Sequence, residues 1–354
     1  MKYPYLADKH WNKQDYLLYA YDVLGDMLRQ ADSQKLSNVT MKFTDERHIS
    51  LFQEAEDKFL WMEQHGYHDI SVKMFCNHMF FSLLRDFCYY IFESLSCAER
   101  RKITVAYTLL RKPMKDNLLY LEWLLASPEE FYSTFLYNNI ESYDISSKKN
   151  FPPERIQDIV DNACGKTYMG KLINYNNLIF DFRFNRKEIY GLQRIWDQTI
   201  HLVTATRDYK TKAGNLNFVF ADNKIWDEFT DYYYFVMPQL MTYVLGICES
   251  LFITKKDVDE VDLLLNRTVR FVKYANIQPD IEPINQLKNN LDLLIQVFES
   301  ESIVPCFTCE SCNDKIKIDA DILNEIIQNW FIICPNCKQE HNICKYYTDC
   351  IKSD

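Results

Sequence analysis

The chain has 354 residues, of which 47% are hydrophobic and 15% aromatic. This composition supports a sizeable hydrophobic core and excludes a largely disordered chain. Only 7 residues are glycine, which argues against a glycine-rich α/β nucleotide-binding fold and favours long helices with few tight turns. The formal net charge is −10. Bulk-charge binding to duplex DNA or a membrane is therefore not expected, because phosphate contacts need clustered Lys and Arg; a local basic patch is compatible with this charge.

No segment has the pattern of a signal peptide or of an uninterrupted transmembrane helix. The first fifteen residues lack an apolar core region, and the most apolar stretch, 232–247, contains Pro238 and Gln239. We therefore expect a cytoplasmic protein with no membrane partner. The five cysteines outside the C-terminal region stand among apolar residues and are predicted to be buried free thiols; they are Cys76, Cys88, Cys97, Cys164 and Cys248.

Apolar residues spaced by three and four predict helices along most of the chain. Pro113 should bend the helix over 103–126, and Ser127 should cap the next helix, with Pro128 at its first position. The remaining predictions are helices over 79–95, 154–163, 186–205, 222–252, 256–274 and 283–298, a turn at 214–215, a short strand at 216–220 and a boundary at 299–305. The predicted fold class is mainly α: a multi-helix bundle over residues 1–300, with subdivisions allowed near 100 and 150, and a small β module over 305–354.

Seven of the twelve cysteines lie between Cys306 and Cys350. Within this region, two Cys-x-x-Cys pairs are separated by about twenty residues, a strong signal for a zinc site. Two residues between thiolates allow one tight turn to direct both sulfurs at a single tetrahedral ion. The pattern resembles the zinc-ribbon family. Four cysteines match its ligand positions: Cys309, Cys312, Cys334 and Cys337.

Cys306 and Cys309 form a further Cys-x-x-Cys pair, so an alternative ligand set contains Cys306 or His341. We favour Cys309 and Cys312 because Asn313, which follows this pair, tolerates the positive φ that the turn tends to need. Four thiolates leave no open coordination position, so the Zn²⁺ is predicted to be structural. Unliganded thiols or a redox pair are the other interpretation, but a βαβ context is missing.

A second candidate site lies on the predicted helix 186–205. Arg194 and His201 are seven residues apart, so two helical turns would bring them to nearly the same side, with Asp197 between them. The opposite side would carry an apolar stripe of Ile189, Leu192, Trp196, Ile200 and Val203. Such a polar face is also ordinary solvated surface.

Arg followed by six residues and His is similar to the Arg-x(4–6)-His motif of HEPN ribonucleases, although Ile195 stands where these proteins usually have a polar residue. The resemblance implies RNA cleavage without metal at a homodimer interface, and a role as a toxin or antiviral defence effector. His201 would move the proton of the 2′-hydroxyl, and Arg194 would stabilise the pentavalent phosphate, beside Asp197.

The segment 109–125 is also similar to a helical hairpin pattern of uncharacterised bacterial proteins. In that pattern an acidic residue usually stands four positions after an arginine, and a histidine lies far downstream. Arg111 and His201 fit the pattern, but Lys115 occupies the acidic position.

Two functions are therefore expected from the sequence. The first is a binding or scaffold protein whose ribbon contacts a protein or RNA. The alternative is the HEPN-like ribonuclease. The sequence contains no recognisable phosphate loop or nucleophile motif that would predict a small-molecule enzyme.

Overall fold

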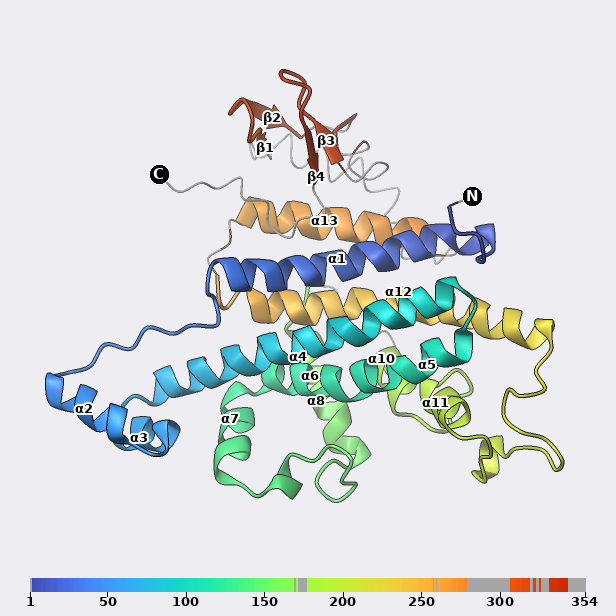
Figure 1. Cartoon of the computed structure of the whole chain (residues 1–354), viewed down its shortest axis with the longest axis horizontal. Coiled ribbons are helices and arrows are strands. Elements are labelled where there is room, and N and C mark those ends of the chain that lie inside the picture. Colours follow the sequence, from blue (N-terminus) through green and yellow to red (C-terminus); the bar gives the residue numbers. More distant parts are fainter. Residues whose placement is uncertain are drawn as a thin grey trace.

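The computed structural model describes residues 2–168, 170, 177–256, 258, 260–278, 306–318, 321–322, 325 and 331–342. In this part of the chain the protein is a helical bundle followed by two small β-hairpins (Figure 1), as predicted. The helices are α1 (Trp11–Ser33), α2 (Glu46–Glu54), α3 (Lys58–Gln64), α4 (His68–Glu99), α5 (Ile103–Arg111), a π-helical segment (Lys112–Asn117), α6 (Leu118–Ala126), α7 (Pro128–Tyr137), α8 (Pro153–Gly165), α10 (Leu178–Arg183), α11 (Leu192–Ile200), α12 (Asn223–Phe252) and α13 (Glu260–Ile277). The predicted helix 283–298 and the boundary 299–305 lie outside the described residues.

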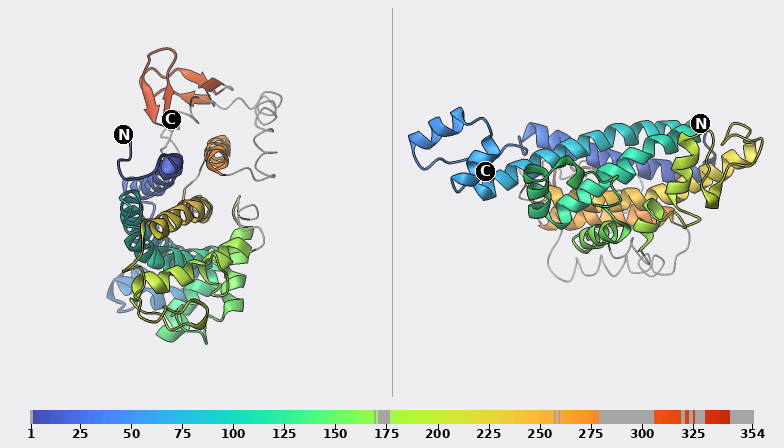
Figure 2. Two further views of the ribbon diagram at one scale, coloured as in Figure 1. Left: turned by 90° about the vertical axis from the view of Figure 1, so that its right-hand side faces the viewer. Right: turned by 90° about the horizontal axis from the view of Figure 1, so that it is seen from below.

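The long helices α1, α4, α12 and α13 form the body of the bundle. Helix α1 packs against α4, α12 and α13, and Figure 2 shows these helices end-on, with α12 beneath α1 and α13. One hydrophobic cluster extends from Tyr3 to Ala275. Among the described helices, α12 is long and apolar enough to cross a bilayer by length and composition, but 94% of its apolar window is buried inside the protein. The five predicted core thiols are all buried.

The bend predicted at Pro113 is a π-helical segment. Proline has no N–H to donate and its ring crowds the preceding turn, so the α-helical ladder is interrupted there. After the segment, the amide of Leu118 donates to the carbonyl of Pro113, five residues back. The carbonyl of Met114 accepts a hydrogen bond from Nε of Arg183, at 2.5 Å. A side chain from α10 therefore satisfies a backbone group within the π-helical segment.

The prediction of a single helix over 186–205 was wrong. Helix α11 covers only Leu192–Ile200, because Gly191 is extended before it and His201 is extended after it, with φ −110° and ψ 132°. Its buried apolar residues are Leu192, Ile195 and Trp196, whereas three members of the predicted stripe are exposed: Ile189 by 74%, Ile200 by 42% and Val203 by 60%.

The segment after α11 is a loop whose backbone bonds to its own polar side chains. Thr211 Oγ1 accepts from the amide of Thr204, and Asn217 Nδ2 donates to the carbonyl of His201. Such local bonds compete with helical hydrogen bonds. The strand predicted at 216–220 is also wrong, since these residues form turns and Phe218 has φ 58°. Helix α7 begins at Pro128 as predicted, but Ser127 forms no side-chain capping bond.

The C-terminal hairpins lie beyond α13 (Figure 2). Strands β1 (Cys306–Thr308) and β2 (Lys315–Lys317) form the first hairpin, and β3 (Phe331–Ile333) and β4 (Glu340–Asn342) form the second. Their shared core contains Ile316, Ile318 and Ile332, and Val269 of α13 packs into it. This module therefore rests on the helical bundle through α13.

Candidate metal centre

Each hairpin carries one Cys-x-x-Cys pair in the turn between its strands. The two strands of each hairpin are antiparallel, with Phe307 opposite Ile316 and Ile332 opposite His341. The first cysteine of each pair follows the first strand by one residue. Both turns consequently bring two sulfur atoms to the end of a hairpin.

The two turns have the same backbone hydrogen bonds, although their sequences differ. In the first, the amide of Asn313 donates to the carbonyl of Cys309 at 2.8 Å; in the second, the amide of Lys338 donates to the carbonyl of Cys334 at 2.9 Å. The residue after each pair has a positive φ, 56° at Asn313 and 63° at Lys338. This confirms the positive φ predicted at Asn313, and it makes the two halves equivalent.

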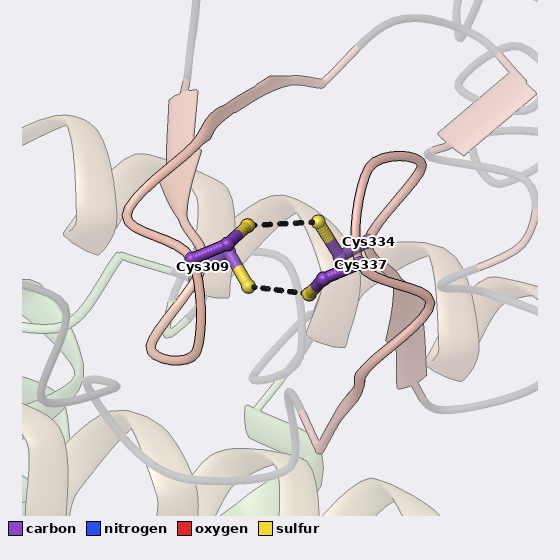
Figure 3. A group of neighbouring side chains, drawn as sticks. Cys309, Cys334 and Cys337 are labelled. Atoms are coloured by element: carbon purple, nitrogen blue, oxygen red, sulfur yellow. Dashed lines mark hydrogen bonds between the residues drawn. The ribbon is translucent and has the colours of Figure 1, made fainter.

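The sulfur atoms of Cys309, Cys312, Cys334 and Cys337 all lie within 4.8 Å of one another. Figure 3 shows the two turns facing each other. The sulfurs of Cys309 and Cys337 are 3.4 Å apart, and those of Cys312 and Cys334 are 3.7 Å apart. A tetrahedral ion with metal–sulfur bonds of about 2.3 Å places its sulfurs about 3.8 Å apart. The spacing therefore fits a metal ion held by these four cysteines.

The sulfurs are too close for all four to ionise without a cation. Burial opposes ionisation of Cys309, but hydrogen bonds from the backbone of Cys312 and Ser311 outweigh it and lower its pKa to about 6. The backbone of Asp314 lowers the pKa of Cys312, yet burial and the neighbouring thiols together raise it to about 12. The first thiolate thus opposes formation of the next, and a bound cation removes this conflict.

The alternative ligands occupy different positions. His341 is buried, and its Nε2 lies 3.2 Å from the sulfur of Cys309. This is hydrogen-bond distance, so His341 can orient the sulfur of Cys309 through a hydrogen bond. Residues around metal sites commonly orient metal ligands in this way. Cys306 lies at the start of β1, opposite Lys317. The group of four sulfurs needs neither residue.

Arg194 and Asp197 take part in a local network on α11. The guanidinium of Arg194 lies 5.8 Å from the ring centroid of Tyr209. Asp197 accepts from Nε2 of Gln193 at 2.8 Å and from the hydroxyl of Tyr209. Both side chains are half-buried, so they are less solvated than an open helix face would be.

His201 is placed differently. It is exposed and follows the last residue of α11. Helix α11 is continuous from Arg194 to Ile200, and the amide of His201 still donates to the carbonyl of Asp197, but the backbone leaves the helix at His201. Arg194 lines a cavity of about 230 Å³ together with Arg186, Lys187 and Tyr209, and His201 is not among its lining residues.

A larger cavity, of about 990 Å³, adjoins the small one and shares Arg186 and Lys187 with it. Its walls come from α5, the π-helical segment, α6, α8, α10, α11 and the loops between them. The only local signal for it in the sequence is the spacing of Arg111 and Lys115, which places both on one helix face. Because the other walls come from distant segments, sequence reasoning missed this site.

Comparison with known proteins adds no further assignment. No protein-family model matches the chain, and neither a curated protein nor a solved structure shows significant similarity to it.

Proposed function

We propose that this chain is a binding or scaffold protein in which Zn²⁺ holds the C-terminal hairpins together as a zinc ribbon. The observation that carries the proposal is the group of four cysteine sulfurs within 4.8 Å. Thiolate ligands in a tetrahedral set favour Zn²⁺ or iron, and Zn²⁺ is the usual ion of closed structural sites. Bound Zn²⁺ would supply folding free energy to a module with a very small apolar core.

A protein is the favoured partner of the ribbon. In its hairpins, residues 306–318 and 331–342, three lysines are matched by three acidic residues: Lys315, Lys317 and Lys338, and Glu310, Asp314 and Glu340. A balanced surface gives little of the counterion release that drives RNA binding. Ile333 is 40% exposed on β3, and an exposed apolar side chain beside polar neighbours suits a protein contact.

The test compares the proteins that copurify with the wild type, Ile333→Asp and Val105→Asp. Val105 is a matched control because it is a 47% exposed apolar residue on the helical body. We expect Ile333→Asp to retain its Zn²⁺ and lose a specific protein that Val105→Asp retains. Copurification of the same proteins with the wild type and with both variants would refute the proposal. Loss of the contact after nuclease treatment would show an RNA partner instead.

The HEPN-like ribonuclease remains a second candidate because Arg194 lines a cavity beside Arg186 and Lys187, where a phosphate would find several cations. The test is RNA cleavage in EDTA by the wild type, His201→Ala and Arg194→Ala. The hypothesis expects cleavage that both substitutions abolish. Absence of wild-type cleavage, or cleavage unaffected by His201→Ala, would reject it.

A further inference from the structure

The cavity of about 990 Å³ beside the π-helical segment has the size of a small-molecule site. The π-helical segment contributes Lys115 and Asp116 to its wall, and α5 contributes Arg111. Segments with π-helical hydrogen bonding are often found at functional sites. The cavity is separate from the ribbon, so a ligand bound there would be independent of the function proposed for the ribbon.

The charge of the wall is opposite to that of the chain. Two carboxylates, Asp116 and Asp144, face five cations in the lining: Arg111, Lys115, Lys148, Arg186 and Lys187. The wall therefore carries a formal charge of 5 − 2 = +3, in a chain whose net charge is −10. An excess of cations in a concave site attracts anions from solution.

Three of these cations lie near one another: Lys115, Arg111 and Arg186. Lys115 is half-buried, and burial, with the nearby guanidiniums of Arg111 and Arg186, lowers its pKa. Its Nζ donates to Oε1 of Gln193 at 2.8 Å. Among the described residues, Arg111 and Arg186 have no side-chain hydrogen bond or ion pair. Like charges kept together without partners cost stability, which a bound anion would offset.

Most of the uncharged lining is apolar or aromatic. It includes Tyr120, Phe151, Phe180 and Phe184, and the rings of Phe180 and Phe184 are 5.7 Å apart between centroids. The hydroxyl of Tyr120 donates to the carbonyl of Tyr143 at 2.7 Å. Cationic and aromatic side chains therefore line the same cavity.

Asp116 adds a hydrogen-bond acceptor to this cavity. Its side chain is half-buried, and burial raises its pKa. It has no hydrogen bond or ion pair among the described residues. A simple fatty anion would offer this carboxyl no donor. A ligand with hydroxyl or amino groups would satisfy it.

We propose that this cavity binds a nucleoside phosphate. The phosphates lie against Arg111, Lys115 and Arg186, and the base packs on the aromatic wall near Tyr120 and Phe180. A ribose hydroxyl or a base amino group donates to Asp116. Arg and Lys are the side chains that bind phosphate through charge-assisted hydrogen bonds, and aromatic rings stack on any base.

The proposal is tested by calorimetric titration of the full, Zn²⁺-loaded chain with ADP, GDP, CDP and UDP, and with adenosine and inorganic phosphate as partial ligands. We expect at least one diphosphate to bind one-to-one, about tenfold or more tightly than either partial ligand. Arg111→Gln and Arg186→Gln should each weaken that binding about tenfold or more, because each removes a charge-assisted contact. Arg47→Gln, an exposed arginine on α2, is the matched control and should bind as the wild type does.

A thermal melt without ligand separates binding from a structural role. Removing an unneutralised cation should leave the melting temperature unchanged or raise it, whereas loss of a structural contact would lower it. The proposal is overturned if no diphosphate binds, if the two cavity variants bind as tightly as Arg47→Gln, or if adenosine or inorganic phosphate binds as tightly as the tightest diphosphate. If an oligoribonucleotide binds at least tenfold more tightly than every diphosphate, the cavity is assigned to RNA instead.

Discussion

The buried pair between Arg183 and Glu122 makes the most demanding prediction for the helical bundle. Both side chains are 0% exposed, and Nη1 of Arg183 lies 2.5 Å from Oε1 of Glu122. Arg183 also donates through Nε to the carbonyl of Met114. A single guanidinium therefore joins α10 to α6 and to the π-helical segment that forms one wall of the cavity.

Replacing Arg183 with Met would leave the carboxyl of Glu122 buried without its cation and would remove one donor from the carbonyl of Met114. Breaking one side of a buried ion pair costs about 3–5 kcal/mol, and a lost hydrogen bond adds about 0.5–1.5 kcal/mol. We therefore expect Arg183→Met to lower the free energy of unfolding by about 4–6 kcal/mol. The double variant Arg183→Met/Glu122→Leu removes both charges and should lose only about 0.5–1.5 kcal/mol, the cost of the lost hydrogen bond.

Urea denaturation followed by tryptophan fluorescence measures these differences. The matched control is Arg85→Met. Arg85 pairs with Asp32 at 2.9 Å, but the two side chains are 44% and 70% exposed, so its loss should cost less than about 1 kcal/mol. The reasoning fails if Arg183→Met is as mild as this control. It also fails if the double variant loses as much stability as Arg183→Met alone.

Three further predictions concern the metal, pH and the thiols. The purified chain should hold one Zn²⁺, which Cys334→Ser should lose. EDTA should abolish protection from hydrogen exchange in 306–318 and 331–342 without changing the helical circular dichroism, because the ribbon core is separate from the main core; a parallel loss of helix would contradict this. Burial lowers the pKa of His10 below its usual 6.5, although Asp231 acts against it. The stabilising effect of its neutral form is therefore complete above pH 6.5 and lost as the pH falls below that value. Urea midpoints at pH 7.5 and 5.5 should consequently differ more in the wild type than in His10→Gln; an equal or smaller difference would disprove the role of His10. Burial raises the pKa of Cys88 and of Cys164 to about 12, so neither should react with a maleimide at pH 8 until urea unfolds the chain. Mass-spectrometric mapping of the labelled residues checks this, and labelling in the native state would show that these thiols are accessible.

The ribbon could be predicted in detail because its information is local. Each Cys-x-x-Cys turn closes within a few residues, and a hydrogen bond between Asn313 and Cys309 fixes it. The preference of Asn313 for a positive φ selected Cys309 and Cys312, and the structure has φ 56° there. Only the contact between the two hairpins is long-range. A metal site with four cysteine ligands already requires this contact, because each hairpin supplies two of the ligands.

The Arg194–His201 face was predicted less well because helix ends depend on competing interactions. Periodicity alone extended the helix to 205. In the structure, side chains of Thr211 and Asn217 bond to the loop backbone, and α11 ends at Ile200. A pattern of apolar residues does not reveal this competition, because the polar bonding partners lie seven and sixteen residues further along the chain.

Residue patterns were enough to predict the helical class, the bend at Pro113, the burial of the scattered thiols and the four cysteines of the candidate metal centre. Each follows from composition, from a fixed backbone preference or from spacing within a short segment. Three features needed the tertiary structure: the end of α11, the hydrogen bond from Arg183 to the carbonyl of Met114, and the position of Arg111, Lys115 and Arg186 around one cavity. The last two features join segments about 70 residues apart, and only the packing of the whole bundle brings such segments together.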